Sequence, residues 1–194
     1  MEFSQNYLLI GIYVAFIIVF LGLMYFLRKL GRKWWCECGK LNLWSSGIWN
    51  KHTSQHMFDA YSFTHMVWGI AIYFVMQYLL PNLNFPTKLL LSTLLGAGWE
   101  IFENTSFVIN RYRRNTISSG YIGDSILNSM GDVLVQELGF VLASYLETKY
   151  SIIIVAFIEL GLLATICDNT TLNTLMQIYP IESVKQWQLE LKNK

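Results

Sequence analysis

Residues 99–132 read WEIFENTSFVINRYRRNTISSGYIGDSILNSMGD, and the fold can be worked out from this stretch outward. It carries two glutamates, three arginines and two aspartates beside or inside apolar segments. Most of the remaining chain is typical of membrane-spanning helix. Ionisable side chains are costly within such segments, so each of them marks a candidate functional position.

The composition indicates one integral-membrane domain over residues 1–194. Hydrophobic residues make up 54% of the chain and charged residues only 14%, against about 25% in typical soluble proteins. The formal net charge is +1 and no long basic run occurs, which argues against nucleic-acid binding. The three cysteines are too few for a secreted disulfide framework.

The apolar runs predict an all-α, polytopic membrane helix bundle with about five transmembrane helices. Residues 7–27 contain no charge, and at about 1.5 Å rise per residue they span roughly 30 Å, the thickness of the hydrocarbon core. Basic residues follow this run, so we expect a retained anchor and not a cleaved signal peptide. The expected spans are residues 7–27, 63–80, 89–109, 124–146 and 151–167.

The segments between these runs are polar. Residues 34–62 contain tryptophans at 34, 35, 44 and 49, a pattern typical of an interfacial loop with aromatic anchors. Residues 110–123 are expected to form a polar loop. The tail after Asp168 is expected to form two short helices separated at Pro180, the second being amphipathic and lying on the membrane surface.

The basic residues are distributed unevenly between the two sides that five spans would create. One side receives six Lys and Arg in residues 28–62, three in 110–123 and three after residue 168. The other side receives only Lys88 and Lys149. Because cytoplasmic loops carry the excess of positive charge, we expect the amino terminus outside and the carboxyl terminus in the cytoplasm.

Helical spacing brings polar side chains together at that cytoplasmic side. Glu100, Glu103 and Asn104 share one face of the third span, and residues 124, 128, 132 and 136 form a polar stripe on the fourth. All three histidines lie before or at the start of the second span, at 52, 56 and 65. We therefore expect the histidine segment to face the acidic helix ends.

Carboxylates and imidazoles are ligands that suit a divalent metal ion, which could activate water or polarise a phosphoryl or carbonyl oxygen. The predicted ligands are His56, His65, Glu100, Glu103 and Asp124, with Asp59 or Asp132 as the base. Arg111, Arg113, Arg114 and Tyr121 would bind an anionic headgroup. The first hypothesis is thus a metal-assisted membrane enzyme acting on a polar or phosphorylated lipid headgroup.

Three other interpretations stay open. The buried groups can satisfy one another and simply fix helix packing, as in a non-catalytic accessory protein. The acidic groups at 100, 103, 132 and 159 can instead relay protons or cations, as in a transporter. The arginines considered alone are more typical of a topology determinant than of a binding site.

A second metal pattern precedes the second span. Cys36-Glu37-Cys38 is followed after thirteen residues by His52 and His56, which resembles a Cys2His2 zinc arrangement. The cysteine spacing is one residue short of the usual minimum, which favours unligated thiols. A disulfide between residues two apart would be strained, and a cytoplasmic loop would keep both thiols reduced.

The runs SQHMFDAYSFTH and WEIFENTSFVINRYRRNTISSGYIGDSILNS, together with C-x-C-G at 36–39 and PIESVKQWQ at 180–188, resemble a family of small bacterial multi-pass cell-membrane proteins of unknown function. The likeness covers roughly residues 36–190. It implies a bacterial inner-membrane location and no particular reaction, so the site residues above rest on the residue pattern alone.

Overall fold

The computed structural model describes the backbone of residues 2–46, 50–118 and 120–192, and the side chains between residues 10 and 190 within these ranges. The predicted aromatic anchor Trp49 lies outside the described residues. The all-α prediction is confirmed, since the described chain contains helices and one isolated bridge between Trp44 and Phe58. The helices are α1 (Glu2–Lys29), α2 (Ser62–Leu79), α3 (Phe85–Glu103), α4 (Ser106–Asn115), α5 (Ile126–Tyr145), α6 (Thr148–Ile166), α7 (Thr170–Ile178) and α8 (Glu182–Lys192).

Three of the described helices are long and apolar enough to cross a membrane. They are Ile10–Lys29 in α1, Ile126–Tyr145 in α5 and Thr148–Ile166 in α6, with mean hydropathies of 2.6, 1.3 and 1.9. Only 17% of the apolar stretch is buried in α1 and in α6, against 56% in α5. Helix α5 is therefore the central helix, and the exposed apolar faces of α1 and α6 suit contact with lipid. The helices α2 and α3 occupy two of the five predicted spans, and the count of five stays a prediction.

The chain between residues 103 and 116 differs from the prediction. The third span was expected to run to residue 109 and to be followed by a polar loop, but α3 ends at Glu103 and α4 begins at Ser106. The chain turns at Asn104, and the Thr105 hydroxyl accepts a hydrogen bond from the Val108 N–H group at 3.5 Å. This side-chain cap starts a new, amphipathic helix, which carries two of the three predicted anion-binding arginines in its last turn.

Close packing of α2 against α5 depends on two glycines. A Cβ atom at Gly69 of α2 would overlap the backbone carbonyl of Gln136 on α5, and a Cβ atom at Gly139 of α5 would overlap the carbonyl of Met66 on α2. Because neither glycine has a side chain, the two helix backbones approach closely. This contact fixes the position of the polar stripe on α5 relative to the start of α2.

The apolar core lies where α1, α3 and α5 meet. Its fully buried members are Leu23 and Leu27 from α1, Ala97 from α3, and Ile126 and Val133 from α5. Ala97 and Val133 lie within one turn of Glu100 on α3 and of Asp132 on α5. The apolar cluster therefore supports one side of the polar site.

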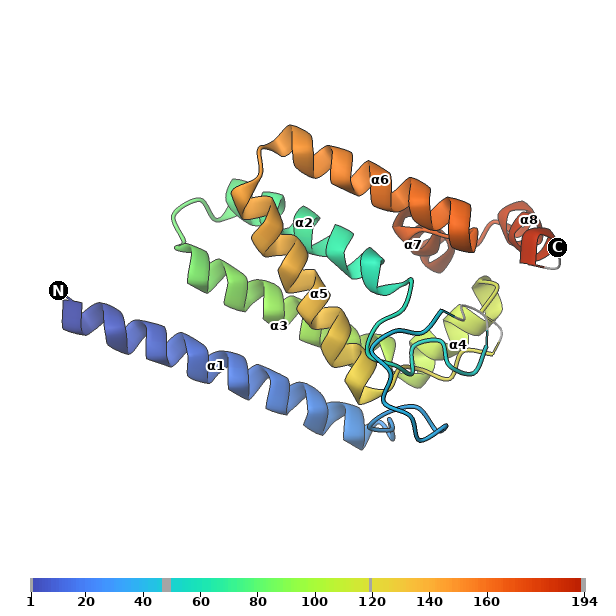
Figure 1. The fold of residues 1–194 in the computed structure, drawn as a ribbon, viewed down its shortest axis with the longest axis horizontal. Coiled ribbons are helices and arrows are strands. Elements are labelled where there is room, and N and C mark those ends of the chain that lie inside the picture. The colour runs from blue at the N-terminus through green and yellow to red at the C-terminus, as the bar shows by residue number, and fades with distance from the viewer. Residues whose placement is uncertain (1, 47–49, 119, 193–194) are drawn as a thin grey trace.

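The loop between α1 and α2, the segment between α4 and α5, and the short helices α4, α7 and α8 gather at one end of the bundle, remote from the amino terminus (Figure 1). The Ile126 and Leu127 N–H groups donate to the carbonyls of Lys33 and Trp34 at 2.8 and 3.0 Å. The Gln55 side chain donates to the Gly123 carbonyl at 2.8 Å. These bonds hold the segments that follow α1 and precede α2 against the start of α5.

The tail forms the two short helices that were predicted, with Pro180 between α7 and α8. The Gln188 side chain of α8 is buried and donates to the Cys167 carbonyl at 2.8 Å. This bond holds α8 against the end of α6. Its expected contact with a membrane surface stays a prediction.

Candidate functional site

An imidazole lies between two buried carboxylates at the loop-bearing end of the bundle. Nδ1 of His65 lies 3.6 Å from Oε1 of Glu100, and Nε2 of the same ring lies 3.9 Å from Oδ2 of Asp132. The three side chains come from α2, α3 and α5, and they are 12%, 1% and 7% exposed. Three helices therefore place one ionisable group each at a single buried point. They correspond to the start of the second, the end of the third and the start of the fourth predicted span.

Glu100 has an unusual environment for a buried carboxyl group. Neither of its carboxylate oxygens accepts a well-formed hydrogen bond among the described residues, and the polar groups beside them are Nδ1 of His65, 3.6 Å from Oε1, and the Ser129 hydroxyl. Leaving a buried acceptor unpaired costs about 1–3 kcal/mol, and more for a charged group. Such a group is expected to be completed by a cation, a proton or a ligand that binds there.

The third helix supplies a second glutamate to the same point. His65, Glu100 and Glu103 each offer one ligand atom, and these atoms lie within 4.8 Å of one another. Two carboxylates and one imidazole form a ligand set that suits Zn²⁺, Mn²⁺ or Fe²⁺ and leaves coordination positions open. We name His65, Glu100, Glu103 and Asp132 the acidic cluster.

A serine connects the acidic cluster to the preceding loop. The Ser62 hydroxyl donates to Oδ1 of Asp132 at 2.6 Å and accepts from the Asp59 N–H group at 3.2 Å. The Asp59 carboxylate accepts from the N–H groups of Ser54 and Tyr61, both at 2.8 Å. Burial nevertheless raises the pKa of Asp59. Both oxygens of Asp59 are thus used to shape the loop, whereas Oδ2 of Asp132 faces the imidazole.

Asp124 lies beside the acidic cluster and is held by two neutral side chains. Asn104 at the end of α3 donates to Oδ2 of Asp124 at 2.9 Å and accepts from the Asp124 N–H group at 2.8 Å. The Tyr121 hydroxyl lies 2.9 Å from both Asp124 oxygens. Asp124 therefore already has three polar contacts, and its role in this structure is to join the end of α3 to the start of α5.

A family model described as a protein of unknown function (DUF2585) matches residues 27–190. The chain belongs to the DUF2585 family. This confirms the resemblance that the sequence motifs indicated, and it extends the matched region to the basic run after the first helix.

Curated relatives are similar over most of their length. A UPF0314 protein of Sinorhizobium fredii is 44% identical over 162 residues, which are 84% of this chain and 82% of the relative. UPF0314 proteins of Brucella anthropi and Paracoccus denitrificans are 40% and 38% identical, over 81% and 92% of this chain and 80% and 92% of the relatives. No solved structure matches the chain.

The arginines of this DUF2585 chain contact backbone carbonyls. Arg111 donates to the carbonyls of Gln177 and Ile178 at the end of α7. Arg113 donates to the Tyr121 carbonyl at 2.5 Å, and Arg114 to the Asn110 carbonyl at 3.3 Å. The first of these contacts holds α7 against α4, because a cation suits the carbonyl end of a helix. Anion binding by this group stays a prediction.

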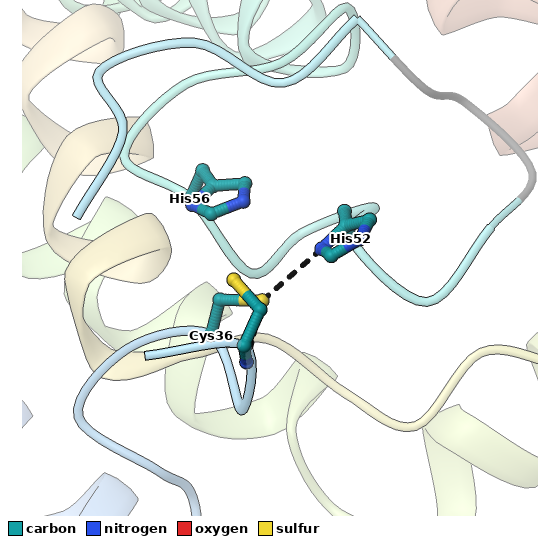
Figure 2. Close-up of side chains that lie close together, drawn as sticks. Cys36, His52 and His56 are labelled. Atoms are coloured by element: carbon teal, nitrogen blue, oxygen red, sulfur yellow. Dashed lines mark hydrogen bonds between the residues drawn. The ribbon is translucent and has the colours of Figure 1, made fainter. Parts of the chain in front are cut away.

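His56 lies apart from the acidic cluster with which the sequence grouped it. It belongs to a second set of side chains, with Cys36, Cys38 and His52, and Figure 2 shows the two imidazoles beside the Cys36 thiol. Of the three histidines, only His65 has a ring nitrogen within 4.8 Å of carboxylate oxygens of both Glu100 and Glu103. The single predicted site is therefore divided between two places.

Ser92 and Glu137, which the sequence pattern did not single out, form a polar group with Gln136 deeper in the bundle. The Ser92 hydroxyl of α3 donates to Oε1 of Glu137 on α5 at 2.8 Å, and the Gln136 side chain donates to the Ser92 carbonyl at 3.0 Å. Still farther along α3, the buried Lys88 donates to the Gln77 side chain at 2.6 Å. The spacing of 88, 92 and 100 by multiples of four was the available signal.

Proposed function

We propose that the chain is a membrane enzyme that uses a divalent metal ion at the acidic cluster to act on a polar or phosphorylated lipid headgroup. The observation that carries this proposal is Glu100, a carboxylate that is 1% exposed and accepts no well-formed hydrogen bond, with His65 at 3.6 Å and Glu103 beside it. A divalent cation held by His65, Glu100 and Glu103 would supply a partner for the Glu100 carboxylate. When bound, the metal supplies Lewis acidity toward a phosphoryl or carbonyl oxygen.

The residues around the ligands fit distinct roles. Asp132 is the better base of the two predicted aspartates, because its Oδ2 atom faces His65 while both oxygens of Asp59 accept backbone N–H groups. The Ser62 hydroxyl orients Asp132 through a 2.6 Å hydrogen bond. Asp132 can accept a proton from an attacking water molecule, and His65 can exchange a proton with it.

The position of the cluster supports an enzyme more than a transporter. His65 lies in the first turn of α2, Glu100 and Glu103 in the last turn of α3, and Asp132 in the second turn of α5. At about 1.5 Å per residue, each group lies within roughly 10 Å of a helix end. A site at that depth lies near lipid headgroups, whereas a transport site is expected near the midplane.

Lipid profiling tests the enzymatic proposal. A strain that lacks the chain is complemented with wild type, with Glu103→Ala or with Glu147→Ala, which alters an exposed glutamate in the α5–α6 turn. We expect one headgroup class to accumulate in the deletion and Glu103→Ala strains and to return to normal in the other two. Unaltered lipids in the deletion strain would contradict the proposal.

A second candidate function is supported by the deeper polar group. Ser92, Gln136 and Glu137 continue from the acidic cluster toward Lys88 and Gln77 near the opposite end of α3. A row of buried polar side chains between two ends of a bundle is a feature of proton and ion pathways. Proton uptake by proteoliposomes that falls in Glu137→Gln, with unaltered lipids in the deletion strain, would favour this function.

A further inference from the structure

Two loop segments that are distant in sequence bring two thiols and two imidazoles together. Cys36 and Cys38 follow α1, and His52 and His56 precede α2, yet one ligand atom from each lies within 4.8 Å of all the others. The Cys36 thiol lies 3.2 Å from Nδ1 of His52. Figure 2 shows this contact and the His56 ring beside the His52 ring.

We propose that Cys36, Cys38, His52 and His56 bind one structural zinc ion. Zinc in a closed four-ligand site has Zn–S bonds of about 2.3 Å and Zn–N bonds of about 2.0–2.1 Å, which puts neighbouring ligand atoms roughly 3.3–3.8 Å apart. The 3.2 Å contact between Cys36 and His52 is close to this spacing, and no pair of the four ligand atoms is more than 4.8 Å apart. Thiolates with imidazoles in a tetrahedral set select zinc over the harder divalent ions.

The buried imidazole of His56 is an independent indication of a missing ligand. His56 is 3% exposed, and its Nδ1 atom has no hydrogen-bond partner among the described residues. The ring stacks on His52 with 5.6 Å between centroids and 17° between planes. A bound zinc ion satisfies a nitrogen that burial has otherwise removed from water.

The short C-x-C spacing is accommodated by a tight turn. The Gly39 N–H group donates to the Cys36 carbonyl at 3.1 Å, and Gly39 has a φ of +73°, which favours glycine. The Cys38 N–H group donates to the Cys36 sulfur at 3.4 Å, as is suitable for a thiolate. This turn brings the Cys38 sulfur to the imidazoles although only one residue, and not the usual minimum of two, separates the cysteines.

The segment that carries His52 and His56 is held in place by hydrogen bonds to Ser125, just before α5. Ser54 has a φ of +56°, and its carbonyl accepts from the Ser125 N–H group at 2.9 Å. The Gln55 carbonyl accepts from the Ser125 hydroxyl at 3.1 Å. The backbone before the cysteines caps α5 at Ile126 and Leu127. Both halves of the proposed zinc site are therefore fixed to the start of the same helix.

This arrangement gives the zinc ion a structural role. All four ligands come from the chain, so no coordination position is left for a substrate. The ion would link the end of α1 to the loop that carries Asp59, and through Ser62 to Asp132. The zinc site is separate from the acidic cluster, and its existence does not depend on the proposed reaction.

Cobalt substitution tests the proposal on the full chain purified in detergent. Wild type is expected to contain zinc that Co²⁺ can replace, giving a thiolate-to-cobalt charge-transfer band and the visible bands of a tetrahedral site. The band should disappear in Cys36→Ser/Cys38→Ser. It should persist in Cys167→Ser, which removes the third cysteine, and in Glu100→Gln/Glu103→Gln, which alters only the acidic cluster.

Thiol alkylation provides a measurement that needs no variant. Cys38 is exposed, so an unligated thiol there reacts quickly with iodoacetamide. We expect Cys38 in wild type to be protected until a chelator is added, while the reactivity of Cys167 does not change. Equal reactivity of Cys38 with and without chelator, or a wild-type protein that gives no thiolate-to-cobalt band, would overturn the zinc assignment.

Discussion

Nδ1 of His65 lies 3.6 Å from Oε1 of Glu100, so an imidazole from α2 faces a buried carboxylate from α3. The two helices form a hairpin whose open ends meet at the loop-bearing end of the bundle (Figure 1). Asp132 of α5 completes the contact from the opposite side of the ring. The proposed reaction depends on this meeting of three helices.

The substitution Glu100→Gln is expected to leave stability unchanged or to raise the free energy of unfolding by about 1 kcal/mol in metal-free protein, because it replaces a buried acidic group that accepts no well-formed hydrogen bond by a neutral amide of the same shape. Denaturant unfolding in detergent with a chelator measures this change. Glu147→Gln, an exposed residue that pairs with Lys149, is the neutral control. A loss of about 2 kcal/mol or more in Glu100→Gln would instead identify the carboxylate as a structural partner.

Asn104→Ala is expected to destabilise the chain by about 2–3 kcal/mol. The side chain makes two hydrogen bonds to Asp124 and a third to the Glu100 carbonyl at 3.0 Å, and its removal leaves buried acceptors unpaired. Thermal unfolding monitored by circular dichroism provides the measurement, with the exposed Asn110→Ala as control. Equal melting temperatures for both variants would show that Asn104 does not join α3 to α5.

Gly69→Ala is expected to cost about 1–3 kcal/mol, because the added methyl group meets the Gln136 carbonyl across the contact of α2 with α5. Gly98→Ala is the matched control on α3. A Cβ atom there meets nothing within 4 Å, so alanine should be neutral or stabilising by up to about 1 kcal/mol. A stable Gly69→Ala protein would mean that the two helices lie farther apart.

The membrane orientation provides a further prediction. The described parts of residues 30–61, of 104–125 and of the tail lie at the same end of the bundle, and these segments hold most of the basic residues of the sequence. A green fluorescent protein fused after the tail should therefore fluoresce in the cytoplasm, and alkaline phosphatase at the same position should be inactive. The reverse pair of results would place the acidic cluster on the outer side.

The long helices were predictable from sequence because an apolar run of that length is typical of a membrane-spanning helix. The break at Asn104 was not predicted, because it depends on a local side-chain cap by Thr105 within a continuous helical pattern. The convergence of His65 with Glu100 and Glu103 was partly predictable from helical spacing and from the alternation of the spans. The usable signal was that His65 lies at the start of its predicted span and both glutamates lie in the second half of theirs.

The separation of His56 from His65 could not be obtained from the sequence. Both histidines lie in the run SQHMFDAYSFTH, and nothing in the residue types assigns them to different sites. The separation arises because Asp59 binds the Ser54 and Tyr61 N–H groups, which turns the chain between the two histidines. The same turn places His56 against the cysteines. The short spacing of these cysteines had favoured unligated thiols over a zinc site.

Metal stoichiometry in the Cys36→Ser/Cys38→Ser protein tests the central claim most directly, because the proposed zinc site is then removed and only the acidic cluster remains. Mass spectrometry of the purified protein after loading with Zn²⁺ or Mn²⁺ should find one ion per chain. The same measurement after adding Glu100→Gln and Glu103→Gln should find none. A Cys36→Ser/Cys38→Ser protein that is folded and binds no ion, or one whose ion remains after both glutamates are replaced, would contradict the proposed metal site.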